Sequence, residues 1–196
     1  AVRATLPNGM TLAVVRQPKA LGLGHAVLCA APVVGNQPFA VMLPDDFIDD
    51  TQGSCLADMV ALYQQHHAYS LAVEEVPRDK TDKYGVVSLD NTDRITAMVE
   101  KPKPEVAPST LAVVGRYVLP AETFSALREV KAGAGGEIQL TDGIAALLSS
   151  HVFRPHRFKG VRFDCGSKLG YLQANVALGL RDAEIGQAFQ AWLKTI

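Results

Sequence analysis

The sequence predicts a mixed, mainly parallel α/β sheet with one β-rich insertion. Short apolar runs alternate with stretches of helical periodicity in the first third of the chain and again near its end. Between them, from Tyr69 on, β-type runs follow one another with only turn residues in between. The 196 residues suffice for one full core and contain no internal repeat, low-complexity tract or linker. We therefore expect residues 1–196 to form a single domain.

The first third is expected to supply two buried strands and two helices. Residues 10–15 and 38–43 are short apolar runs and are predicted to be buried strands. Residues 25–31 are largely apolar, which predicts a short, fully buried helix. In 55–67 the apolar residues recur at roughly helical spacing, which predicts a helix with one apolar face.

The middle of the chain is predicted to be β-rich, and its end returns to alternating strands and helices. The predicted strands are 71–73, 85–89, 95–99, 111–119, 152–158 and 161–163. Thr141 and Asp142 can cap a helix that runs to about residue 150. Two helices, 168–180 and 184–195, close the chain, and each carries an apolar face. Such faces serve either core packing or an oligomer interface, and we expect a homo-oligomer.

Composition excludes several classes of partner. The chain has 19 Lys+Arg and 20 Asp+Glu, a net charge of −1, and no dense basic block, so we expect no nucleic-acid partner. No apolar stretch approaches ~20 residues, so we expect no membrane-spanning helix. The first residues lack the charged and apolar regions of a signal peptide. Cys29, Cys55 and Cys165 are widely spaced, which favours a reducing, cytoplasmic compartment over disulfides or a zinc site.

Two aspartates follow predicted strands. Asp45 comes just after 38–43, and Asp164 comes just after 161–163. Open α/β sheets bind ligands at the carboxyl ends of their strands. Mg²⁺ needs only one or two carboxylates when substrate phosphates supply further oxygens. A turn or a helix cap explains either aspartate alone equally well. Their shared position at strand ends favours a Mg²⁺ site.

A second candidate group lies at the end of the strand 95–99. Glu100 can accept sugar hydroxyls and Lys101 can bind phosphate, while Pro102 disfavours a helical conformation at Lys101. Gly85 opens the neighbouring strand, where a missing side chain lets the backbone approach a ligand closely. A solvated ion pair and an ordinary strand-start glycine are the alternative interpretations.

A glycine pattern near the N-terminus does not predict a dinucleotide-binding turn. Gly22 and Gly24 resemble the first two glycines of that fingerprint, but Val27 occupies the third position. Several residues also separate Gly22 from the preceding predicted strand, whereas the fingerprint needs a tight strand-to-helix turn. His25 is then a residue at the start of a helix rather than a catalytic base.

Six segments in chain order resemble the bacterial UTP–glucose-1-phosphate uridylyltransferases. They are RQPKALGLGHAVLCAAPVVG, LPDDFIDD, YGVV, VEKPKPEVAPSTLAVVGRYVL, GAGGEIQLTD and FDCGSKLGYLQA. The resemblance runs from about residue 10 to the end, and its specificity comes from the order of the six segments. It implies a Rossmann-like nucleotidyltransferase fold. It also implies transfer of a uridylyl group from UTP to glucose 1-phosphate, giving UDP-glucose and pyrophosphate.

The resemblance assigns roles to the matching residues on the nucleotide and metal side. Gln17 and the backbone at Gly22 are expected to contact uracil. Asp45 and Asp164 are expected to hold Mg²⁺.

On the sugar-phosphate side, the resemblance implies that Gly85 and Glu100 meet the glucose and that Lys101 meets its phosphate. Glu137 and Asp142 belong to a matching segment, and we expect structural roles for them.

The implied chemistry agrees with the residue types. A phosphate oxygen of glucose 1-phosphate attacks the α-phosphorus of UTP in line, and pyrophosphate leaves. The attacking phosphate is already anionic, so no general base and no covalent intermediate are needed. Catalysis is then positioning and charge neutralisation. The expected catalytic residues are Asp45, Lys101 and Asp164.

The chain departs from the family at its N-terminus. The glycine-rich phosphate loop of GxGTRxxPxTKxxPK type has no match, and about ninety residues of the family's first lobe are absent by this resemblance. We therefore expect that the chain opens within a domain and that these 196 residues alone are inactive. We also expect exposed apolar sheet edge beside 10–15.

Two alternatives to the uridylyltransferase interpretation stay open. One is a thymidylyl- or guanylyl-transferring relative with the same fold. The other is a non-catalytic module that binds sugar nucleotides or forms oligomers. Competition between UTP and dTTP distinguishes the first alternative from a uridylyltransferase. Metal-independent binding of UDP-glucose without turnover would indicate the second alternative.

Overall fold

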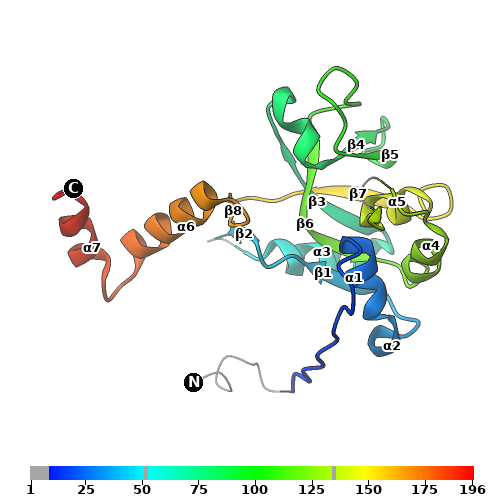
Figure 1. The fold of residues 1–196 in the computed structure, drawn as a ribbon, viewed down its shortest axis with the longest axis horizontal. Helices are drawn as coiled ribbons and strands as arrows, with labels where there is room; N and C mark the ends of the chain where they lie inside the picture. Colours follow the sequence, from blue (N-terminus) through cyan, green and yellow to red (C-terminus); the bar gives the residue numbers. More distant parts are fainter. Residues whose placement is uncertain (1–8, 51–52, 134–135) are drawn as a thin grey trace.

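A twisted sheet forms the body of the molecule (Figure 1). The computed structural model describes residues 9–50, 53–133 and 136–196. Five strands of the sheet run in the order β5-β4-β6-β3-β7, and a sixth, β1, pairs with β6. Their bounds are β1 (Phe39–Met42), β3 (Tyr69–Glu75), β4 (Gly85–Leu89), β5 (Ile95–Glu100), β6 (Leu111–Leu119) and β7 (Phe153–Arg157).

β6 is the central strand of the sheet, and all nine of its residues are buried. One edge of β6 pairs with β3, from Ser70 opposite Val118 to Glu75 opposite Leu111. The other edge is shared by β1 at the C-terminal end of β6 and by β4 at Ala112. A strand buried on both faces and paired on both edges needs a mostly apolar sequence, and only Gly115 and Arg116 interrupt the apolar residues here.

The α/β class is confirmed, but the expectation of mainly parallel pairing is wrong. Among the strand pairs in the described residues, only β3 and β7 are parallel. β1, β3 and β7 do run in one direction, as a strand–helix alternation predicts. However, β6 runs antiparallel between β1 and β3, and β4 and β5 form a hairpin across a short turn. Such a turn can join only antiparallel strands.

Helices cover both faces of the sheet. One face packs against α1 (Leu23–Cys29), α2 (Ala31–Val34), α4 (Thr123–Glu129) and α5 (Leu140–Ala145). The other packs against α3 (Cys55–His66), whose Cys55 and Met59 meet Ala72, Val114 and Val118. Alternate residues of β6 serve the two layers, in keeping with the period of two in a strand.

A second, smaller sheet lies at the side of the body. It is the antiparallel ribbon of β2 (Asp46–Asp49) and β8 (Val161–Asp164), and α6 (Lys168–Arg181) follows it directly. The Ser167 hydroxyl caps α6 by accepting the Gly170 N–H at 3.0 Å. From there α6 and α7 (Gly186–Leu193) project away from the body (Figure 1). A 3₁₀ segment, η2 (Arg78–Lys83), joins β3 to β4.

Most of the predicted elements are present, but two expectations fail near the N-terminus. Residues 10–15 are not a buried strand: they have no regular structure, and Val14 is 87% exposed. A strand needs a neighbour for its backbone groups, and no described strand pairs with this segment. The helix predicted at 25–31 is α1, but it is not fully buried, because only Gly24 and Val27 lie inside.

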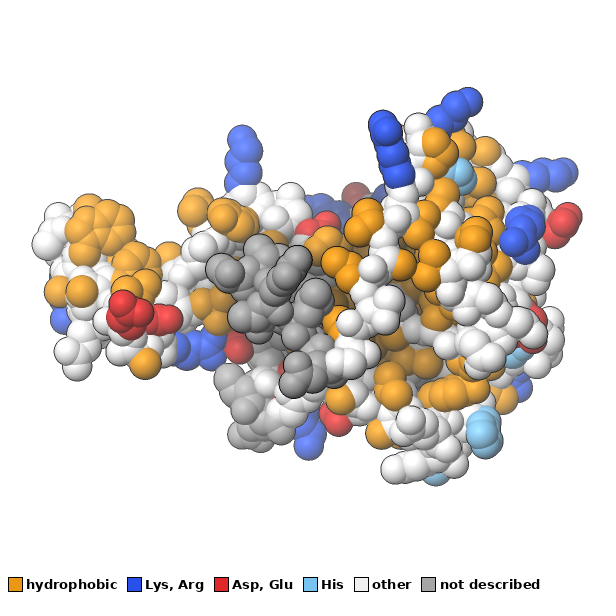
Figure 2. Space-filling view, turned by 90° about the horizontal axis from the view of Figure 1, so that it is seen from below, with side chains coloured by type: hydrophobic (Ala, Val, Ile, Leu, Met, Phe, Trp, Pro, Cys, Tyr) orange, Lys and Arg blue, Asp and Glu red, His pale blue; other side chains and the backbone are white. Residues whose placement is uncertain are grey.

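The two closing helices expose apolar side chains rather than burying them in the body. Leu169, Leu172 and Ile185 are among the exposed large side chains, and Figure 2 shows hydrophobic side chains on this projecting segment. The apolar faces of α6 and α7 therefore do not serve the core of the described body.

None of the helices in the described residues combines the length and the apolarity that crossing a bilayer requires. Cys29, Cys55 and Cys165 are free thiols.

Candidate functional site

A cleft of about 450 Å³ opens where the small ribbon meets the main sheet. Residues from α1, β2, β4, β5, β6, α5 and β8 line it. Six of the seven residues expected in the site contribute to its walls: Gly22, Asp45, Gly85, Glu100, Lys101 and Asp164. The cleft thus gathers side chains from distant parts of the sequence.

The ribbon brings the two candidate metal ligands together. Asp46 stands opposite Asp164 in the β2–β8 register, so Asp45 and Asp164 are neighbours across the ribbon. The Cys165 N–H donates to the Asp45 carbonyl at 2.7 Å and closes this end. A Cβ on Gly166 would lie 3.1 Å from an Asp45 carboxylate oxygen and 3.2 Å from an Asp164 oxygen. Both carboxylates therefore reach the same point.

This donor set fits Mg²⁺ better than a metal that needs a full set of protein ligands. Asp45 and Asp164 are exposed, and no cluster of three or more His, Cys, Asp or Glu that could hold a metal occurs in the described residues. Mg²⁺ commonly keeps several waters and binds one or two carboxylates together with substrate phosphates. The open geometry leaves room for those phosphates.

Asp46, next to Asp45, is committed to a different contact. One of its carboxylate oxygens accepts from the Arg162 guanidinium, and the other accepts the Gly115 N–H at 3.0 Å. Gly115 has to be glycine, because a Cβ there would come within 2.4 Å of the Asp46 Cβ. Asp46 therefore binds the ribbon to β6 rather than facing a ligand.

Arg162 is almost fully buried and has three partners. Its side chain is 8% exposed; besides Asp46 it reaches the Glu74 carboxylate at 3.4 Å and the Tyr84 hydroxyl at 3.5 Å. Its guanidinium also lies 5.2 Å from the centre of the Tyr84 ring. Burial would lower the pKa of Arg162, but the Tyr84 hydrogen bond and the Asp46 charge together raise it above its ordinary value.

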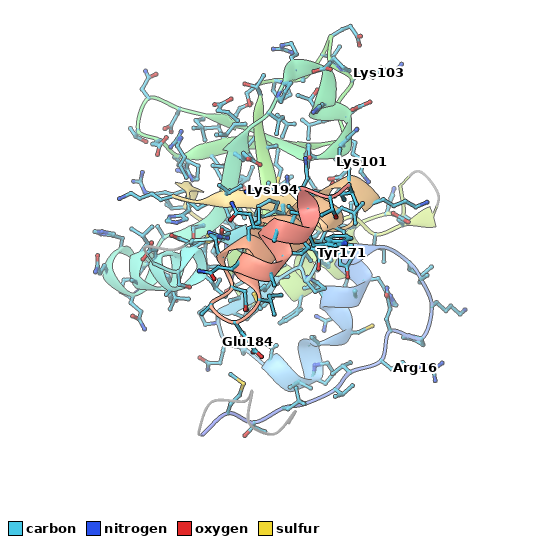
Figure 3. The ribbon with its side chains drawn as sticks, turned by 90° about the vertical axis from the view of Figure 1, so that its left-hand side faces the viewer. Arg16, Lys101, Lys103, Tyr171, Glu184 and Lys194 are labelled. Carbon is cyan, nitrogen blue, oxygen red and sulfur yellow. The ribbon has the colours of Figure 1, made fainter. Side chains whose placement is uncertain are left out.

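The Glu100–Lys101 pair lies at the other wall of the cleft. The Lys101 Nζ is 3.4 Å from a Glu100 oxygen, and the Lys101 N–H donates to the Tyr84 carbonyl at 2.9 Å. In Figure 3, Lys101 lies near the middle of the molecule and Lys103 near its outer edge.

The backbone at Lys101 avoids the right-handed helical region, as expected before Pro102, but it adopts a rarer conformation. Its φ of 45° lies in the left-handed region. The β4–β5 ladder ends at Glu100, and the bond to Tyr84 then turns the chain at Lys101. Such strain persists where surrounding contacts over-determine it, which is typical of binding sites.

Thr141 has a different role from the helix cap expected of it. α5 begins at Leu140, with Gln139 as its N-cap, so Thr141 is already inside the helix. The Thr141 hydroxyl instead donates to a Glu100 oxygen at 2.5 Å and orients that carboxylate. Partial burial, and then the nearby Glu100 charge, raise the pKa of Asp142. The polar end of α5 is therefore part of the site environment.

The two residues expected to contact uracil, Gly22 and Gln17, lie at and before the start of α1. Gly22 has φ 90° and is the N-cap, and a Cβ there would come within 2.9 Å of the Glu137 Cβ. Gln17 does not reach the cleft wall. Its amide donates to the Gly22 carbonyl at 3.1 Å and lies 3.0 Å from His25 Nδ1, so it supports the Gly22 turn from behind.

Comparison with known proteins decides which family this site belongs to. The nucleotidyl transferase family matches residues 3–179. The UTP–glucose-1-phosphate uridylyltransferases of Haemophilus ducreyi and Escherichia coli K12 are both 43% identical, over 100% and 98% of this chain. The chain belongs to this uridylyltransferase family. The family's reaction is uridylyl transfer between UTP and glucose 1-phosphate, so the expected enzyme class is confirmed.

Solved structures support the same assignment. A UDP-glucose pyrophosphorylase from Acinetobacter baumannii has a TM-score of 0.85 at 41% identity, covering 97% of this chain and 67% of that one. A UDP-glucose pyrophosphorylase complexed with UDP-glucose has a TM-score of 0.81 at 42% identity, covering 84% of this chain and 64% of that one. The chain spans 70% of the H. ducreyi relative, 67% of the E. coli one and 61% of a Pseudomonas aeruginosa one.

Sequence reasoning missed Arg162, Asp46 and Tyr84 as parts of this uridylyltransferase cleft. A signal for Arg162 was present, because it stands two residues before Asp164 on a strand and must therefore share its face. The partnership of Arg162 with Asp46 and Tyr84 depends on which strands pair. The pattern within each segment does not contain that information.

Substitution Gly85→Ala tests whether the sugar binds at the Gly85 wall of the cleft. The new Cβ would lie 3.1 Å from Met98 Cε and 3.4 Å from both Glu100 Oε2 and Thr141 Oγ1. Met98 is flexible at this end, so we expect the free energy of unfolding to change by less than ~1 kcal/mol. We expect the Kd for UDP-glucose to rise about tenfold, because overpacking costs ~1–3 kcal/mol. Titration calorimetry and thermal melts measure the two effects.

The control for this substitution is Gly53→Ala, whose Cβ would meet nothing closer than 3.9 Å. Unchanged affinity in Gly85→Ala would mean that the sugar does not approach Gly85.

Proposed function

We propose that this cleft is the site of uridylyl transfer, with Mg²⁺ and the phosphates held between its two walls. One observation carries the proposal: the β2–β8 ladder sets Asp45 beside Asp164 on one wall, while Glu100 and Lys101 stand on the other. A metal-facing pair of carboxylates and a phosphate-facing ammonium in one cleft are the groups that transfer between two phosphates requires.

On the sugar side, we infer that Glu100 accepts hydroxyl protons of glucose. Thr141 occupies one of its oxygens, which leaves the other, now paired with Lys101, available to the ligand. Gly85 leaves space above this carboxylate. Lys101 then neutralises the phosphate of glucose 1-phosphate.

On the metal side, Asp45 and Asp164 would hold Mg²⁺, which neutralises charge on the phosphates when bound. The two aspartates need no proton transfer in this role. Arg162 keeps Asp46 occupied, so the neighbouring Asp45 alone faces the common point with Asp164. Lys101 and the aspartates thus orient the two phosphates in line.

On the nucleotide side, we propose that the Gly22 backbone contacts uracil. The positive φ of Gly22 and its close approach to Glu137 and Ile138 leave no room for a side chain. Gln17 would act through Gly22, because its amide donates to the Gly22 carbonyl.

Binding of UDP-glucose to the 196-residue chain tests the proposal without requiring turnover. Titration calorimetry in Mg²⁺ and in EDTA should give tighter binding with the metal, and glucose 1-phosphate should compete. Preference for UDP-glucose over dTDP-glucose separates this function from thymidylyl transfer. If the affinity for UDP-glucose is the same with and without Mg²⁺, and Asp45→Asn leaves it unchanged, the non-catalytic module is favoured. Absence of binding would refute the proposed site.

We also propose a single domain, a homo-oligomer and a cytoplasmic location. The exposed apolar side chains of α6 and α7 support self-association, and the three free thiols are compatible with a reducing compartment. Light scattering of the purified chain measures the oligomeric state.

A further inference from the structure

The two walls of the cleft come from separate sheets. Asp45 and Asp164 lie at one end of the two-stranded ribbon, whereas Glu100 belongs to the six-stranded sheet. In the described residues no β-ladder joins the ribbon to the larger sheet. The ribbon follows β1 through a short chain link, where the Leu43 N–H donates to the Gly115 carbonyl at 2.8 Å. Beyond this link, side-chain contacts hold the ribbon against the larger sheet.

Arg162 is the side chain that spans this gap. It belongs to β8, and it ion-pairs with Asp46 on the facing strand β2. Asp46 in turn accepts the N–H of Gly115, which belongs to β6 of the large sheet. The guanidinium is thus fixed at the ribbon end by two N–H groups directed to one carboxylate.

The other side of Arg162 reaches the sugar-phosphate wall through Tyr84. The guanidinium lies over the Tyr84 ring, 5.2 Å from its centre, and approaches its hydroxyl at 3.5 Å. The Tyr84 carbonyl accepts the N–H of Lys101 at 2.9 Å, where the backbone is in the left-handed conformation. Contacts therefore run continuously from the ribbon to Lys101.

We propose that Arg162 is a positioning residue that holds Lys101 at a set distance from Asp45 and Asp164. The proposal rests on the proposed function of the cleft and adds how its two walls are aligned. Arg162 is not a phosphate ligand itself, because it is 8% exposed and its donors are directed to Asp46, Glu74 and Tyr84.

Two changes at Arg162 test this role in the full 196-residue chain. Arg162→Lys keeps the charge but cannot form the paired contact with Asp46 or lie flat over Tyr84. Arg162→Gln combined with Asp46→Asn removes both charges together, so it avoids leaving Asp46 buried and unpaired. Arg157→Gln is the matched control, because Arg157 pairs with Asp93 at 3.1 Å on the exposed surface, away from the cleft.

The first measurement is amide hydrogen exchange, which needs no ligand. We expect the Lys101 amide to exchange at least tenfold faster in Arg162→Lys, because its acceptor on Tyr84 is no longer fixed. The amides of Val86 and Val99, paired in the β4–β5 ladder, should keep their protection. A uniform acceleration of all three would mean general destabilisation and would overturn the proposal, as would an unchanged Lys101 amide.

The second measurement is a double-mutant cycle in the Kd for UDP-glucose with Mg²⁺. We expect Arg162→Lys and the charge-free pair to weaken binding about tenfold, since a small misplacement of a binding group is costly. In either background Lys101→Met should then cost at least about fivefold less than it costs in the unmodified chain, because Lys101 is already misplaced. Arg157→Gln should bind as the unmodified chain does. The proposal would be overturned if the losses of affinity at Arg162 and Lys101 were fully additive. It would also be overturned if Arg162→Lys bound UDP-glucose as tightly as the unmodified chain does. Failure of the unmodified chain to bind UDP-glucose would refute the proposed function, and this inference with it.

Discussion

Substitution of Asp45 by alanine is expected to lower the rate of UDP-glucose formation by more than ~100-fold, the scale of one lost electrostatic stabiliser. Asp45 and Asp164 reach a common point beside Gly166, so each would supply part of the proposed metal site. With one carboxylate removed, Mg²⁺ would be held by Asp164 and the substrate phosphates alone. Asp45 is exposed, so the melting temperature should change little.

Pyrophosphate release from UTP and glucose 1-phosphate measures this rate, in a protein that joins the chain to its family's phosphate loop. In the 196-residue chain, Asp45→Ala should abolish the increase in affinity for UDP-glucose that Mg²⁺ gives. Asp79→Ala, at an exposed position outside the cleft, is the control. Near-full activity of Asp45→Ala at low Mg²⁺ would show that the metal assignment is wrong.

The elements that sequence reasoning located well are those whose signal is local. β6 was predicted with its observed bounds because its nine buried residues are mostly apolar, with only Gly115 and Arg116 interrupting the run. α3 was found from its periodicity. The strand expected at 10–15 shows the limit of this reasoning. Its apolar residues fit a buried strand, but a strand forms only where a partner offers backbone hydrogen bonds. The direction of pairing was missed for the same reason.

The candidate site divides in the same way. Asp45 and Asp164 could be picked out because each lies at the end of a strand, and strand ends are where α/β sheets bind ligands. Arg162 could not be connected to Tyr84, because they are far apart in sequence and meet only when the ribbon folds against the sheet. Residue types therefore predicted the chemistry of the two walls, whereas the contacts that align the walls needed the fold.

Lys101→Met is expected to weaken UDP-glucose binding by roughly 10- to 100-fold, because a hydrogen bond to a charged group contributes ~1.5–3 kcal/mol. Methionine keeps an apolar stem of similar length, so the change removes the ammonium and little packing. Lys103→Met is the matched control, because Lys103 lies in the same loop but at the outer edge of the molecule (Figure 3). Equal affinity of the two variants would mean that Lys101 does not bind the phosphate.

A second variant at this position separates binding from stability. Lys101 has φ 45°, which costs a residue with a side chain about 1 kcal/mol and costs glycine almost nothing. Lys101→Gly should therefore raise the free energy of unfolding by up to ~1 kcal/mol while it lowers affinity as Lys101→Met does. Urea unfolding and calorimetry measure the two quantities on one preparation. A rise in the free energy of unfolding together with a fall in affinity would mean that the strained backbone is retained for the ligand. A fall in both quantities would mean that the Lys101 side chain stabilises the fold itself.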